Sequence, residues 1–235
     1  MPSIRRQQGF TLVEMAIVLV IIGLLLGGIL KGQELITSAR VRNIADQNSG
    51  VQAAYYGFID RYRQVPGDWG KDNAAQAIPG VEHGGNASGR LDGDGFGEAL
   101  ALWEQLSKSG FIQGHYTGGS TAPTQDDVNL APRNAFNGFL MLFSSSDYED
   151  VSGNTPSEKL NLVLGTGIPV NVIAELDRKI DDGLPLTGVV RQAVTTGGHF
   201  GQISQSKTAC VRNEDKVEIW DIEKNEQNCN AVYLY

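Results

Sequence analysis

Residues 10–30 read FTLVEMAIVLVIIGLLLGGIL, and the sixteen residues from Met15 to Leu30 carry neither a charge nor a hydrogen-bonding side chain. A helix needs about twenty apolar residues to cross a bilayer, so this length predicts a transmembrane helix. Length does not explain Glu14, because a carboxylate near hydrocarbon costs on the order of a few kcal/mol unless it is paired. Glu14 therefore predicts an ion pair with a cation in the same surroundings.

A short basic segment, residues 1–9, precedes the apolar run and ends at Gly9. It contains Arg5 and Arg6 and no acid, which predicts that this end stays in the cytoplasm while the rest of the chain is exported. An ordinary secretory signal has its small-residue cleavage site after the apolar region. Here the glycine lies before that region and no A-x-A site follows Leu30, which argues against ordinary secretion.

The basic leader ending in Gly9, the aromatic Phe10, the following Thr11-Leu12-Val13-Glu14 and the apolar run together resemble the N-terminus of type IV pilins and type II secretion pseudopilins. The resemblance implies that a prepilin peptidase cuts after Gly9 and that the new amine of Phe10 is methylated. It also implies that Glu14 pairs with this amine, in its own or a neighbouring subunit, during assembly. The implied partners are the membrane, other pilin subunits, the prepilin peptidase/methyltransferase and an inner-membrane assembly platform.

The resemblance divides the chain into a cleaved leader (1–9), a long helix (10–63) whose first part (10–30) is the transmembrane segment and filament core, and a head (64–235). Past Leu30 the helix is predicted to become amphipathic, because one set of residues recurs at spacings of three or four. These are Thr37, Val41, Ile44, Asn48, Val51, Tyr55, Phe58 and Tyr62. This face is predicted to pack on the head.

The head is predicted to be a single α+β domain, in which the long helix packs on an antiparallel β-sheet with inserted loops. Apolar and β-branched content predicts strands at 160–164, 188–194, 216–222 and 231–235. Helical spacing predicts helices at 98–109 and 170–180, and residues 67–90 are predicted to be a Gly/Asn-rich loop.

The formal net charge of −8 argues against nucleic acid as the main partner, because phosphate contacts need clusters of Lys and Arg and none appears. The two cysteines, Cys210 and Cys229, lie close together near the C-terminus without a nearby histidine pair for zinc. A disulfide between them is predicted to persist in an oxidising compartment, with two free buried thiols as the alternative. The resemblance favours the disulfide, since C-terminal disulfide loops are common in pilins.

An acidic loop, Leu91-Asp92-Gly93-Asp94-Gly95-Phe96-Gly97-Glu98, presents short acids alternating with glycine. Such oxygens suit calcium, which makes Asp92, Asp94 and Glu98 a candidate ligand set. The spacing is not that of an EF-hand, and a solvated turn that caps the next helix is the alternative. Apart from this structural calcium, no cofactor is predicted.

Catalysis has little support in the sequence: the histidines are scattered and there is no G-x-S-x-G nucleophile turn. We therefore predict a non-enzymatic structural subunit, a minor pilin or pilin-like protein of a type IV pilus-like filament. The precursor is predicted in the inner membrane with its N-terminus in the cytoplasm, and the mature subunit in the periplasm or in a surface filament. The alternatives are a type II secretion pseudopilin and, from another class, a membrane-anchored periplasmic binding or enzymatic domain.

Overall fold

The computed structural model describes residues 11–93 and 95–235, so the predicted cleavage residues Gly9 and Phe10 and the candidate ligand Asp94 lie outside the described residues. The chain forms two compact units, one that ends at Ala39 and a second, the head unit, from Arg40 to Tyr235. The boundary between the units falls inside the long helix, and each unit is described by itself below.

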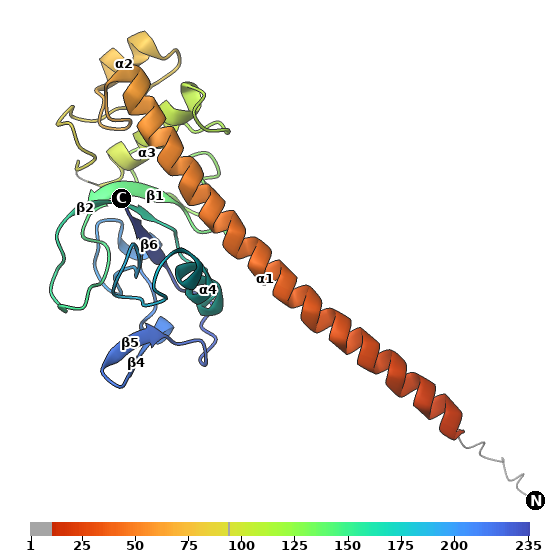
Figure 1. The fold of residues 1–235 in the computed structure, drawn as a ribbon. Coiled ribbons are helices and arrows are strands. Elements are labelled where there is room, and N and C mark those ends of the chain that lie inside the picture. Colours follow the sequence, from red (N-terminus) through yellow and green to blue (C-terminus); the bar gives the residue numbers. More distant parts are fainter. Residues whose placement is uncertain (1–10, 94) are drawn as a thin grey trace, which may run out of the picture. The chain divides into compact units, whose positions relative to one another are not determined.

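The first helix, α1 (Leu12–Tyr62), confirms the predicted N-terminal apolar helix and runs through both units (Figure 1). Among the described residues it is the one helix long and apolar enough to cross a membrane. In the first unit its large apolar side chains, from Leu12 to Ile36, are exposed. A contiguous apolar surface of this kind indicates that another apolar phase covers it.

Within the head unit α1 buries one face, as the spacing predicts. Val41, Ile44, Val51, Tyr55 and Phe58 are all buried and belong to the same hydrophobic core as the sheet. Beyond Tyr62 the chain turns at a left-handed residue and then meets Pro66 and Gly67, which do not continue the helix.

The predicted antiparallel sheet is confirmed. It has four strands in the order β1-β2-β6-β3, and every neighbouring pair is antiparallel (Figure 1). The strands are β1 (Met141–Ser145), β2 (Lys159–Val163), β6 (Ala231–Leu234) and β3 (Val190–Gln192). A separate hairpin pairs β4 (Val211–Glu214) with β5 (Val217–Trp220). Helix α4 (Val170–Ile180) contacts β3 and β5, and helix α3 (Gly97–Lys108) contacts β1.

Three elements correct the sequence-based assignment. Helix α2 (Lys71–Ala77) lies inside the stretch predicted as an irregular loop, and strands β1 and β4 were not predicted. Strand β1 is buried at four of its five positions, so it lacks the alternation that identifies a half-buried strand. The β4–β5 turn uses Asp215 and Lys216, both at positive φ, where Asn-Gly or Asp-Gly is the usual signal.

Candidate functional site

The N-terminus of α1 is capped by Thr11 and Glu14. The carboxylate oxygen Oε2 of Glu14 accepts hydrogen bonds from the backbone N–H and the hydroxyl of Thr11, both at 2.8 Å, and the N–H of Glu14 donates to Thr11 Oγ1 at 3.3 Å. This reciprocal pattern is a capping box, in which a residue at the cap and an acid three positions later satisfy each other's backbone donors. Glu14 also remains exposed, so a cation can still approach it.

Three buried carboxylates hold the loop around the acidic motif. Glu104 accepts the backbone N–H groups of residues 82 and 83, Glu98 accepts those of 86, 92 and 93, and Asp68 accepts those of 88 and 89. The distances lie between 2.7 and 3.2 Å. Seven loop amides therefore find charged acceptors inside the protein, which satisfies backbone donors that no sheet or helix takes.

Two glycines make this arrangement possible because the loop passes directly against the carboxylates. A Cβ at Gly85 would lie 2.6 Å from Glu98 Oε1, and one at Gly93 would lie 2.7 Å from Glu98 Cδ. These two glycines are therefore explained by close backbone approach, a reason that the sequence alone did not provide.

The candidate calcium ligands are placed as follows. Glu98 is 5% exposed and both of its carboxylate oxygens accept loop amides. Asp92 accepts a hydrogen bond from the Ser88 hydroxyl at 2.9 Å and lies 3.9 Å from the Nε of Arg90. Asp94 is outside the described residues, so calcium binding by this set of three stays a prediction.

A different acidic group gathers at the end of α4. Carboxylate oxygens of Asp177, Asp181 and Asp182 lie within 4.8 Å of one another, close enough to share one cation. Asp177 is fully buried, and its carboxylate accepts the indole N–H of Trp220 at 2.7 Å and the N–H of Gly183 at 3.3 Å. Burial, with the charges of Asp182 and Asp181, raises the pKa of Asp177 to about 7, while the two hydrogen bonds act in the opposite direction.

Cys210 and Cys229 form a disulfide, as predicted, and both are buried. The bond closes a loop that contains the β4–β5 hairpin, and Trp220 on that hairpin carries the contact to Asp177. The disulfide and the buried contact between Trp220 and Asp177 therefore both hold the segment that carries the hairpin against the head.

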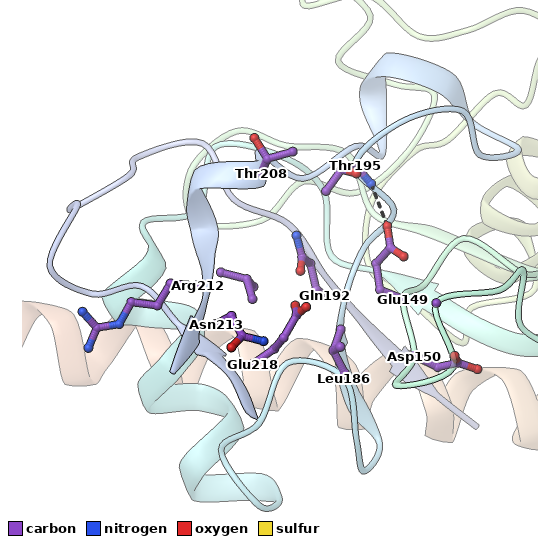
Figure 2. Close-up of a pocket in the computed structure, with 11 residues that line it drawn as sticks. Glu149, Asp150, Leu186, Gln192, Thr195, Thr208, Arg212, Asn213 and Glu218 are labelled. Atoms are coloured by element: carbon purple, nitrogen blue, oxygen red, sulfur yellow. Dashed lines mark hydrogen bonds between the residues drawn. The ribbon is translucent and has the colours of Figure 1, made fainter. Parts of the chain in front are cut away.

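A surface recess of about 290 Å³ lies beside this hairpin (Figure 2). Glu149, Gln192, Asn213 and Glu218 contribute to its polar lining, and Glu149 accepts the N–H of Thr195 at 3.2 Å. Arg212 also lines it, but its guanidinium points away from the other labelled side chains and pairs with Glu214 and Glu223 (Figure 2). The recess therefore offers acids and amides for polar contacts.

A family model described as the prokaryotic N-terminal methylation motif matches residues 4–30. This motif is the signature of type IV pilins and pseudopilins, which are structural subunits. The chain carries the signature at its N-terminus, and the match supports a type IV pilin-like or pseudopilin precursor that assembles with other pilins and is processed by a prepilin peptidase. In the same comparisons no curated protein and no solved structure matches the chain.

Proposed function

We propose that the protein is a non-enzymatic structural subunit, a minor pilin or pilin-like protein, of a type IV pilus-like filament. The observation that carries the proposal is the methylation motif at residues 4–30, which continues into a helix with an exposed apolar surface. Cleavage between Gly9 and Phe10 converts this segment from a membrane anchor with a basic leader into a helix that begins with a charged amine.

The exposed apolar surface of α1 suits both environments of the proposed subunit, the membrane and the core of the filament. Side chains such as Leu24, at 73% exposure, and Leu30, at 67%, are stable against lipid and would be costly in water. Moving from lipid into a filament core brings little further hydrophobic gain, because lipid is as apolar as leucine. Packing and polar contacts must therefore select the filament position.

Glu14 supplies this selection in the proposed mechanism. In the precursor it caps α1 through Thr11, and after cleavage it lies four residues from the amine of Phe10. A carboxylate and an ammonium that pair in an apolar core offset each other's desolvation, whereas an unpaired charge costs about 3–5 kcal/mol there. A subunit that docks out of register keeps an unpaired charge and is rejected.

The disulfide near the C-terminus supports the pilus over the secretion pseudopilin, since C-terminal disulfide loops are common in the pilins that the chain resembles. The head is then displayed in the periplasm or on the filament surface. The carboxylate-bound loop amides and the disulfide both strengthen a domain that works outside the cytoplasm.

Two measurements test the proposal. Intact-mass analysis of membrane-extracted protein is expected to show a chain that begins at methylated Phe10, and Gly9→Val is expected to leave the uncut precursor. A mature chain that begins at Met1 would refute processing. Filament entry is then measured for Glu14→Gln and Glu14→Leu as the amount in sheared fibres relative to the membrane pool, and both variants are expected to fall about tenfold or more.

Thr11→Ala is the matched control, because it removes the side-chain partner of Glu14 in the helix cap and keeps the carboxylate. Loss of a cap costs about 1 kcal/mol, so this variant is expected to enter fibres nearly normally. If Thr11→Ala fails as severely as Glu14→Gln, the carboxylate acts by capping the helix and the pairing mechanism is wrong.

A further inference from the structure

Strand β3 carries a buried amide that the fold leaves without a hydrogen-bond partner. Gln192 is 3% exposed, and its backbone is fully bonded, because its N–H donates to the carbonyl of Pro185 at 2.7 Å and its carbonyl accepts the N–H of Glu149 at 2.9 Å. The side-chain amide of Gln192 has no partner within the described part of the chain. A buried amide without a partner is unfavourable, which favours a ligand that satisfies it.

The amide of Gln192 faces the recess beside the hairpin. Gln192 lines this recess of about 290 Å³, and Figure 2 shows its amide between Glu149 on one side and Glu218 on the other. Neither amide atom is enclosed, since neither is among the fully buried, unpartnered side-chain atoms of the described residues. A ligand can therefore reach the amide through the open recess, without movement of a strand or loop.

The two carboxylates beside this amide have no cation partner. Glu149 uses one oxygen to accept a backbone N–H, and its other oxygen has no partner in the described chain. Glu218 is exposed and its side chain forms neither a hydrogen bond nor an ion pair with a described residue. The remaining acid of the lining, Asp150, turns away from Gln192 and accepts a backbone N–H at 2.7 Å (Figure 2). Because the guanidinium of Arg212 pairs with two other acids, the recess presents two negative charges that its own lining does not neutralise.

We propose that the recess beside the hairpin binds a small aliphatic diamine. In this arrangement one ammonium group donates to Glu149, the other donates to Glu218, and the side-chain oxygen of Gln192 accepts a further N–H. Leu186 and Val211 belong to the same lining and offer apolar contacts to the methylene chain. The volume lies just below the roughly 300–1,000 Å³ of drug-sized ligand sites, which suits a short ligand.

A metal ion fits this recess less well than an organic cation. Hard cations need several oxygens that converge on one point. Within the described ranges, one group of three acids brings its carboxylate oxygens within 4.8 Å of one another, and that group lies at the end of α4. The recess instead places a carboxylate on each side of an amide, which suits a ligand with separated N–H donors. The site is independent of the assembly proposed for the N-terminal helix.

The test is calorimetric titration of the full-length protein in an uncharged detergent, at about 0.15 M salt, where the attraction of distant charges is largely screened. The probes are putrescine, 4-aminobutanol and 1,4-butanediol, which share one carbon chain and differ by one charge at each step. Putrescine is expected to bind about tenfold more tightly than 4-aminobutanol, and 1,4-butanediol is expected not to bind measurably. A lysine side chain of another protein offers the same ammonium group, so acetyl-lysine methylamide is the fourth probe. Tighter binding of this probe than of putrescine would overturn the assignment to a diamine.

Glu218→Gln is the decisive variant, because this residue is exposed and can be changed without disturbing the core. It is expected to bind putrescine about tenfold more weakly, and to bind putrescine and 4-aminobutanol equally to within about twofold. Asp215→Asn is the matched control. It removes one charge from the same hairpin outside the recess, and asparagine tolerates the positive φ of this turn. Gln192→Met is expected to weaken putrescine binding while leaving the free energy of unfolding unchanged, since no internal hydrogen bond is lost.

Three results would overturn the proposal. Equal binding of putrescine and 1,4-butanediol to the unmodified protein would show that charge plays no part. Equal weakening by Asp215→Asn and Glu218→Gln would show that only the overall charge of the acidic head attracts the probe. Undiminished putrescine binding by Gln192→Met would show that the buried amide does not contact the ligand.

Discussion

The contact between Asp177 and Trp220 predicts how stability depends on pH. The pKa of Asp177 is raised from 3.8 to about 7 in the folded head, chiefly by burial. An acid with a raised pKa binds its proton more tightly in the folded state, so its contribution is fully present below the unfolded value and is lost as pH rises toward 7. At about 1.36 kcal/mol per pH unit, the loss across this window is at most about 4 kcal/mol.

Asp177→Asn isolates this contribution, because asparagine keeps an oxygen for the indole N–H and does not ionise. The free energy of unfolding of the unmodified protein relative to the variant is expected to fall by about 2–4 kcal/mol between about pH 4.5 and pH 8. Denaturant unfolding of both proteins in the same detergent, followed by tryptophan fluorescence, measures the difference, and other titrating groups cancel. Glu175→Gln, on the same helix with its carboxylate paired to Lys179, is the control. It keeps Asp177, so its free energy of unfolding is expected to fall with pH as that of the unmodified protein does.

A stability difference between the unmodified protein and Asp177→Asn that stays constant from about pH 4.5 to pH 8 would refute the assignment of this proton to Asp177. A difference that changes only when calcium is added would show instead that a cation neutralises the acids at the end of α4.

Three further predictions concern the head. Glu98→Gln keeps one oxygen for the loop amides but turns its NH₂ group toward the remaining N–H groups, so it is expected to lower the free energy of unfolding by about 3 kcal/mol. Denaturant unfolding measures this loss, and a loss below about 1 kcal/mol would contradict the role of the charge. Cys210→Ser removes the disulfide between two cysteines that are 19 positions apart, and it is expected to lower the free energy of unfolding by about 3 kcal/mol. This loss is expected to reduce the amount of exported protein. Calcium is predicted to raise the melting temperature, and Asp92→Ala with Asp94→Ala to abolish that rise; identical melting in calcium and in chelator excludes the site.

Much of the fold was predictable where burial of one face gives apolar residues a regular spacing along the sequence. Helix α4 begins and ends at the predicted residues, since Pro169 precedes it and a buried face repeats through Val170, Ile173 and Ala174. The buried face of α1 follows the same rule. The strands that were missed are those for which the pattern fails, β1 by being buried at nearly every position and β4 by ending in a turn without glycine.

The N-terminal site shows a signal that was present in the sequence and was not used. Thr11-Leu12-Val13-Glu14 has the capping-box spacing, so a structural role for Glu14 at the helix start could have been predicted alongside its pairing role. The contact between Asp177 and Trp220 is different in kind. It joins residues 43 positions apart through tertiary packing of α4 against the hairpin. A contact of this kind cannot be predicted from the spacing of residues within one helix or strand.

The acidic composition of the chain is partly a consequence of how the head satisfies its irregular backbone. Asp68, Glu98, Glu104 and Asp147 are nearly fully buried, and each accepts two or more backbone N–H groups from loops. A carboxylate offers two oxygens and a charge to such donors, so it satisfies a glycine-rich loop better than a neutral side chain does. An acid beside glycines in this chain is therefore as readily explained by loop amides as by calcium, and only the direction in which its oxygens point distinguishes the two roles.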